Sequence, residues 1–227
     1  MSGHYQHIFV LMQRVQDALI KGYTGYQIIR CDEAKAAQLK RKFAAAYETE
    51  ISKQARWRRR RAGLACAKFL TVGDADGAVT GFLMVTAGAG LVMKEPLLDP
   101  SRKRITIAAY ELIHDGVGWS WRFTAEAMKQ WRSRLHSAIA SADTEELQQL
   151  VRYLYRTAGF RLVRRQVGEL AKYIRGEWRR LRRGPPPELP SFLPYVRRLP
   201  DDWTPGGLPP SIIARGKRPV LGTGRAP

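Results

Sequence analysis

The chain has 227 residues, of which 44% are hydrophobic and 26% are charged, as in a typical folded globular protein. Its charge is one-sided, because 39 Lys and Arg residues stand against 20 Asp and Glu residues and give a formal net charge of +19. This composition excludes a largely disordered chain, and the excess of positive charge favours a polyanionic partner such as nucleic acid.

Membrane insertion and secretion are not expected from this sequence. It has no run of about 18 apolar residues, and its first residues lack the charged, apolar and small-residue regions of a secretion signal. The two cysteines, Cys31 and Cys66, lie far apart and form no paired zinc-binding motif. We therefore expect a cytoplasmic protein with isolated thiols, no metal or other cofactor, and no membrane partner.

The amino-terminal part is expected to contain a short strand and a long helix. Residues 4–16 are rich in Ile, Phe, Val and Leu and fit either a buried strand or the start of a helix. A turn and a short strand are expected over residues 22–30. Residues 31–61 carry acidic residues at the front, many alanines, and apolar residues at four-residue steps. This pattern predicts one long helix, with Gly63 as its stop.

Two β-hairpins and a helix are expected next. Apolar runs flank the stretch "GDADGA" at residues 73–78, and a second pair flanks "HDGVG" at residues 114–118. The first stretch contains the leading aspartates of a calcium loop, but the remaining EF-hand ligands are absent, so we interpret it as a turn. Residues 124–141 predict a helix with Thr124 as its N-cap. Together these elements predict an α+β fold, with a mostly antiparallel sheet covered by helices.

The sequence changes character at Asp143. Residues 143–159 predict a helix that is acidic in its first turn and basic in its last, which suits the helix dipole. Residues 160–183 predict a second helix, apolar on one side and basic on the other, with nine basic residues against two acidic ones. These two segments form a basic C-terminal helical pair.

Most of the prolines lie beyond Gly184, which predicts an extended Pro-rich arm without regular structure. The arm contains too many aromatic and aliphatic residues for a simple linker, so we expect it to dock on its own domain or on a protein partner. The chain therefore divides into an α+β domain (residues 1–142), a basic helical segment (143–184) and an extended Pro/Gly-rich arm (185–227).

Two arginine-rich helices are the main candidates for function. The stretch "KQARWRRRRAG" at residues 53–63 holds six cations, and the helix over residues 160–183 holds nine. A solvated surface normally interleaves acids with bases, and here acids are nearly absent. Arg and Lys neutralise phosphates and release counterions, and the planar guanidinium binds phosphate oxygens in pairs. The predicted nucleic-acid-binding residues are Lys53, Arg56, Trp57, Arg58, Arg59, Arg60, Arg61, Arg161, Arg164, Arg165, Lys172, Arg175, Arg179, Arg182 and Arg183.

Three tryptophans could add stacking surfaces for bases. Trp57 lies within the first cluster, and Trp119 and Trp121 lie on an expected strand. Aromatic rings between arginines favour RNA or single-stranded DNA, whose bases are free to stack. The alternative is that all three side chains belong to the apolar core, and the sequence leaves both interpretations open.

The amino-terminal stretch "GHYQH" is the one candidate for catalysis. His4 and His7, with Tyr5 between them, could activate a 2′-hydroxyl and protonate a leaving oxygen in RNA without a metal ion. The alternative is that both histidines are simply exposed or packed. No P-loop and no nucleophile elbow is present, so nucleotide hydrolysis and serine hydrolase chemistry are not expected.

The order of expected elements resembles ferredoxin-like or RRM-like RNA-binding domains, which include the endoribonucleases that mature CRISPR RNA. No motif at named positions accompanies this resemblance, which concerns the fold only. Three hypotheses therefore stay open. The chain is a nucleic-acid-binding protein without catalysis, a metal-independent endoribonuclease or other nucleic-acid-processing protein, or a structural subunit of a ribonucleoprotein whose arm contacts protein partners.

Overall fold

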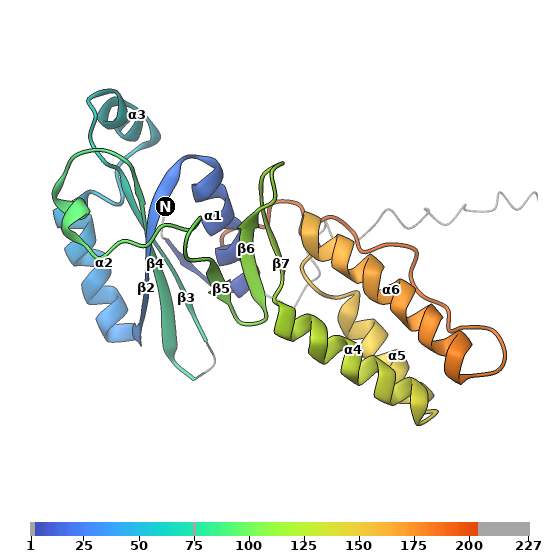
Figure 1. Ribbon diagram of the computed structural model, residues 1–227. Coiled ribbons are helices and arrows are strands. Elements are labelled where there is room, and N and C mark those ends of the chain that lie inside the picture. Colours follow the sequence, from blue (N-terminus) through green and yellow to red (C-terminus); the bar gives the residue numbers. More distant parts are fainter. Residues whose placement is uncertain (1–2, 75, 204–227) are drawn as a thin grey trace, which may run out of the picture.

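The computed structural model describes residues 3–74 and 76–203 and shows an α+β architecture (Figure 1). The strands are β1 (His4–Tyr5), β2 (Tyr23–Asp32), β3 (Ala67–Gly73), β4 (Ala78–Thr86), β5 (Ile105–Ile107), β6 (Tyr110–His114) and β7 (Trp119–Phe123). The helices are α1 (Ile8–Ile20), α2 (Glu33–Tyr47), α3 (Lys53–Arg61), α4 (Ala125–Ala140), α5 (Thr144–Leu154) and α6 (Arg161–Leu181), with a short 3₁₀ turn, η1 (Leu91–Lys94).

The strands form two sheets. The larger sheet has the order β1-β3-β4-β2, in which β1 and β3 are parallel and the other neighbours are antiparallel. The smaller sheet, β5-β6-β7, is antiparallel throughout. The two expected hairpins are confirmed as β3–β4 and β6–β7. At the first turn the Asp74 side chain accepts hydrogen bonds from the backbone N–H groups of Asp76 (3.0 Å) and Ala78 (2.8 Å), as in an aspartate-stabilised turn.

Both faces of the larger sheet are buried. Successive side chains of a strand point to opposite faces, and β4 shows this directly. Phe82 and Met84 join the core that contains α1, the smaller sheet and α4–α6. Leu83 and Val85 join a second core under α2, built around Phe43. The larger sheet is therefore a middle layer, with helices on either side (Figure 1).

The smaller sheet connects the larger one to the C-terminal helices. Trp121 on β7 is fully buried, and its indole N–H donates to the carbonyl of Met12 on α1 at 2.9 Å. On the other side of β7, the Gln166 side chain of α6 bonds both backbone groups of Phe123, at 2.6 and 3.1 Å. Because these groups would otherwise be unpaired at a sheet edge, Gln166 fixes α6 against the sheet.

The expected single helix over residues 31–61 is wrong, because the segment is two helices. Glu48 adopts a left-handed conformation (φ 52°) and ends α2. Ser52 then starts α3, its hydroxyl accepting from the N–H of Ala55 at 3.1 Å. The apolar spacing continues through the break, and the local capping residue decides the outcome. The expected stop at Gly63 is confirmed, with φ 72° directly after α3.

The remaining sequence expectations for the helices are confirmed. Residues 4–16 take the helical alternative from Ile8 onward, after the two-residue strand β1. Thr124 caps α4, its hydroxyl accepting from the N–H of Ala127 at 3.1 Å. No helix among the described residues combines the length and apolar character needed to cross a bilayer.

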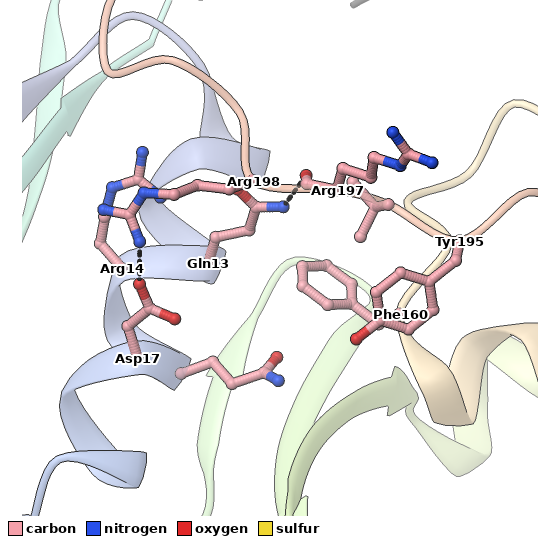
Figure 2. A pocket seen from close by; sticks show the side chains of 9 residues that line it. Gln13, Arg14, Asp17, Phe160, Tyr195, Arg197 and Arg198 are labelled. Carbon is pink, nitrogen blue, oxygen red and sulfur yellow. Dashed lines mark hydrogen bonds and ion pairs between the residues drawn. The ribbon is translucent and has the colours of Figure 1, made fainter. Parts of the chain in front are cut away.

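Residues 184–203 form no helix or strand and run back across α1, so this part of the arm docks on its own chain. The Gln13 amide bonds the arm in both directions: it donates to the carbonyl of Arg197 (2.7 Å) and accepts from the N–H of Leu199 (2.8 Å). Figure 2 shows the cavity of about 170 Å³ between α1 and the arm. Residues 204–227 of the expected arm lie outside the described residues.

Candidate nucleic-acid interface

Helix α3 is a solvent-exposed cationic element. None of its residues is buried, and Arg58 to Arg61 form its last turn, where positive charge suits the helix dipole. Trp57 is 57% exposed and lies under the guanidinium of Arg61, 5.0 Å from the ring centre. Trp57 is therefore a surface residue beside arginine, not a core residue.

The cations of α3 have few carboxylate partners. Arg59 forms an ion pair with Glu48, and among the described residues no other cation of this helix lies within 4.0 Å of a carboxylate. Arg56 is half-buried and donates to the carbonyl of Thr49 at 2.8 Å. Arg60 lies over the ring of Tyr23 at 5.2 Å. The exposed charge of α3 is consequently open to an external anion.

Helix α6 combines a buried side with a basic side. Its buried residues pack against α4 and β7: Leu162, Val163, Val167, Leu170, Ala171 and Ile174. On the exposed side, Lys172, Arg175 and Arg179 have no carboxylate within 4.0 Å in the described chain. The expected amphipathic helix is confirmed here.

Three arginines of α6 are engaged in contacts within the protein itself. Arg161 forms a two-pronged ion pair with Asp115 in the β6–β7 turn, both hydrogen bonds being 2.7 Å, and this contact holds the pKa of Asp115 well below its usual range. Arg165 pairs with Glu169 at 3.6 Å, and Arg164 donates to the arm carbonyl of Leu193 at 2.8 Å. These three residues are thus less available to a ligand than Lys172, Arg175 and Arg179.

A groove of about 320 Å³, here called the α6 groove, lies between α6 and the arm. Its lining includes Tyr155, Arg164, Gly168, Lys172, Arg175 and Phe192. Phe192 is 51% exposed, and Tyr195, which is 53% exposed, lies 5.8 Å from the guanidinium of Arg164. The groove therefore places cations beside exposed aromatic rings.

Gly168 leaves the α6 backbone bare in this groove. A Cβ atom built at Gly168 would meet no other atom within 4 Å, so internal packing does not require glycine. Glycine inside a helix costs about 1 kcal/mol relative to alanine. Close approach of a ligand to the helix backbone is one physical reason to retain it.

The two basic helices do not form one continuous surface. Helix α3 lies beyond one end of the larger sheet, whereas α6 lies at the opposite end of the molecule (Figure 1). The remaining predicted cations, Arg182 and Arg183, follow α6 at this far end. The sequence predicts both clusters as nucleic-acid-binding residues, but the fold places them far apart.

The other aromatic candidates have different positions. Trp121 is fully buried, so of its two open interpretations the core one is correct. Trp119 is half-buried with its ring centre 5.4 Å from that of His114. Phe192 and Tyr195 are not among the predicted binding residues, but Phe192 lines the same groove as Lys172 and Arg175, and Tyr195 lies near Arg164. The sequence feature that points to these two residues is the unusually high number of apolar residues in the Pro-rich arm.

The candidate catalytic residues each have a structural contact. The Nδ1 atom of His4 lies 3.1 Å from the Thr71 hydroxyl. Tyr5 is buried, and burial raises its pKa to about 12. His7 caps α1, its Nδ1 accepting from the N–H of Phe9 at 3.1 Å, and burial lowers its pKa. These positions do not test the prediction of RNA cleavage, which stays a prediction.

Comparisons with protein-family models, with curated proteins and with solved structures find no match for this chain. Among the described residues, no group of three or more His, Cys, Asp or Glu side chains is arranged to hold a metal ion. Cys31 and Cys66 are free thiols. Charge, exposed rings and cavities are therefore the features that bear on function.

Proposed function

We propose that the protein binds nucleic acid, with RNA or single-stranded DNA favoured, through the α6 groove and through α3. The observation that carries the proposal is the set of exposed cations without carboxylate partners beside exposed aromatic rings. Lys172 and Arg175 line the same groove as Phe192, and Arg61 covers Trp57. Cations of this kind release counterions from a phosphate backbone, while rings stack on unpaired bases.

In the α6 groove, Lys172 and Arg175 would bind successive phosphates and Phe192 would stack on a base. Arg179 and Tyr195, which do not line the groove, would extend this contact beyond it. Gly168 would let the strand approach the helix backbone. A duplex keeps its bases stacked on one another, so exposed rings favour a single strand. Stacking on one aromatic side chain is worth roughly 1–3 kcal/mol.

Helix α3 would form a second, separate contact. Since α3 and α6 lie at opposite ends of the molecule, only a strand long enough to pass across it reaches both. Two linked contacts raise affinity through effective concentration, so affinity should rise once the strand exceeds the distance between them.

The proposal does not use the ferredoxin-like or RRM-like resemblance. RRM domains bind bases on an open face of the sheet, whereas both faces of the larger sheet are buried here. It also includes no cleavage step, and cleavage by His4, Tyr5 and His7 stays a separate prediction.

Fluorescence anisotropy with labelled single-stranded RNA, single-stranded DNA and duplex DNA, in EDTA and over a range of salt concentrations, tests the proposal. The triple variant Lys172→Gln, Arg175→Gln, Arg179→Gln should weaken binding. It should also reduce the slope of log binding constant against log salt concentration by about 2, since each phosphate contact to a single strand contributes about 0.7 to that slope. The matched control replaces Lys35, Lys42 and Arg102, which are exposed elsewhere, by Gln. Equal loss in both triple variants would contradict a groove on α6. Fragments in EDTA would indicate cleavage as well.

A further inference from the structure

A second cationic cavity lies away from α6, at the junction of β3, α1, α3 and the arm, and is here called the Lys68 cavity. Its volume is about 130 Å³. Its charged lining comes from distant parts of the chain: Arg14, Lys40, Glu50, Arg56, Lys68, Arg198 and Asp201. Five of these residues are cations and two are acids, so the cavity has an excess of positive charge.

The two acids are already bound to cations of the lining. Asp201 accepts hydrogen bonds from Nε (2.8 Å) and Nη2 (2.5 Å) of Arg14, and Glu50 lies 3.5 Å from Nζ of Lys40. Arg198 pairs with Asp17 outside the cavity lining. Lys68 and Arg56 have no carboxylate within 4.0 Å anywhere in the described residues, so the positive charge of these two is uncompensated.

Three polar atoms of the lining residues have no hydrogen-bond partner within the described part of the protein. They are Nη1 of Arg14, Nε of Arg56 and the hydroxyl of Thr49, all inaccessible to solvent. Arg14 and Thr49 are only 7% and 6% exposed. A buried donor without an acceptor is costly, and six such atoms occur among the described side chains. Half of these atoms belong to residues that line this one cavity.

Lys68 lies among groups of its own sign. It projects from β3 toward the α1 side of the sheet, half-buried, and its Nζ lies 5.0 Å from the ring centre of Tyr23. Arg56 and Arg60 of α3 and Lys21 at the end of α1 add positive charge near it, and Asp17 is an acidic neighbour. Burial and these cations lower the pKa of Lys68 to about 8. An anion would stabilise the charged form.

We propose that the Lys68 cavity binds a phosphoryl group. Such a group offers three or four acceptor oxygens, enough to receive hydrogen bonds from Arg14, Arg56, Thr49 and Lys68 together, whereas a carboxylate has two. Guanidinium groups match phosphate geometry in pairs. A cavity of about 130 Å³ holds several waters or one small anion, and a nucleobase would remain outside.

This site is separate from the α6 groove and lies beside the inner, half-buried side of α3. The phosphoryl group can belong to the end of a nucleic-acid strand or to a free phosphate or nucleotide. Both sources present the same chemistry to the cavity. The proposal therefore holds whether or not the α6 groove binds a strand.

The test measures the thermal unfolding of the full chain, and calorimetric binding, with inorganic phosphate against chloride at equal ionic strength. Wild type should gain stability and bind phosphate. Lys68→Met should unfold no earlier than wild type without phosphate, because it removes an uncompensated half-buried charge, yet it should bind phosphate about tenfold more weakly or worse. The matched control Lys42→Met, at an exposed position of α2, should respond as wild type does.

Thr49→Val is a second test variant for the case in which Lys68→Met misfolds. It removes only the Thr49 hydroxyl and keeps the shape of the side chain. It should also reduce phosphate binding. Equal phosphate responses in wild type and both cavity variants would overturn the proposal, as would an absence of phosphate binding by wild type. Binding of oligonucleotides with and without a 5′-phosphate then identifies the source of the phosphoryl group. If the protein prefers the phosphorylated strand and Lys68→Met abolishes this preference, the site binds strand ends. If both oligonucleotides bind equally, the site binds free phosphate species.

Discussion

Helices α3 and α6 carry similar sequences of arginines but differ in how the fold holds them. Helix α6 has six buried apolar residues, and among the described residues three of its arginines form ion pairs, with Asp115, Glu169 and Glu177. Helix α3 has no buried residue and one ion pair, to Glu48. Charge on α6 is thus displayed by a helix that the core fixes, whereas α3 depends on its caps and on Arg56 and Arg60 against the sheet. Arginine content alone does not distinguish a structural helix from a peripheral one.

The largest expected effect separates the two helices by stability. Leu170→Ala in α6 removes a fully buried side chain and should lower the free energy of unfolding by about 2–5 kcal/mol. Trp57→Ala in α3 removes a larger but exposed side chain and should change it by less than about 0.5 kcal/mol. Urea denaturation of both variants checks the contrast. A comparable loss in Trp57→Ala would show that α3 is part of the cooperative core.

The second prediction compares, in binding, the aromatic residues of the arm beside α6 with Trp57 of α3. Phe192→Ala and Tyr195→Ala should each weaken binding of single-stranded RNA by about 1–3 kcal/mol, since each would remove one stacking surface. Trp57→Ala should have this effect only on strands long enough to reach α3 from the α6 groove. Anisotropy with a series of strand lengths measures both. An identical effect of Trp57→Ala at every length would place the primary contact on α3.

The third prediction concerns the inner cations of α3, which lie close to Lys68. Folding lowers the pKa of Lys68 to about 8. Below pH 8 the folded protein therefore holds Lys68 charged in unfavourable surroundings, which lowers the free energy of unfolding. As the pH rises from about 8 toward 10.5, the folded lysine loses its proton while the unfolded one keeps it, and wild type gains stability. Lys68→Met should therefore be the more stable protein below pH 8, by about 1–2 kcal/mol after allowance for partial exposure. Denaturation at several pH values tests this, and a constant difference between the two proteins would contradict it.

The smallest effect comes from two glycines of α6. Gly168→Ala and Gly176→Ala should each raise the free energy of unfolding by about 1 kcal/mol, because neither new Cβ meets another atom within 4 Å. Only Gly168 lines the α6 groove, so only Gly168→Ala should weaken nucleic-acid binding. Equal nucleic-acid binding by both variants would contradict the proposal that a strand approaches the α6 backbone closely at Gly168.

Features set by neighbouring residues were predictable from the sequence. The Asp74 turn, the Thr124 cap and the amphipathic pattern of α6 each depend on interactions within a few residues. The break after Tyr47 was missed, since the apolar spacing continues through it and only Ser52 marks a new start. The general α+β class followed from the hairpins, but the parallel β1–β3 pair and the second sheet depend on long-range packing.

The candidate site was predictable only in part. Local sequence shows that α3 and α6 are basic. It does not show that Arg161 is held by Asp115, whereas Lys172 has no carboxylate partner in the part of the chain that the structure describes. Nor does it distinguish Trp57 from Trp121, one exposed and one fully buried. A binding role for Lys68 could not be predicted from the sequence, because its neighbours come from α1, α3, β2 and the arm. Sequence indicates which charges exist, and tertiary packing decides which of them a ligand can use.

The two-way hydrogen bonding of Gln13 to the arm has a consequence for biosynthesis. The partners, Arg197 and Leu199, follow Gln13 by 184 and 186 residues along the chain. Until translation reaches them, the amide of Gln13 and the guanidinium of its neighbour Arg14 lack these partners in the arm. Packing of the arm on α1 can therefore form only after residues 197–199 have been synthesised.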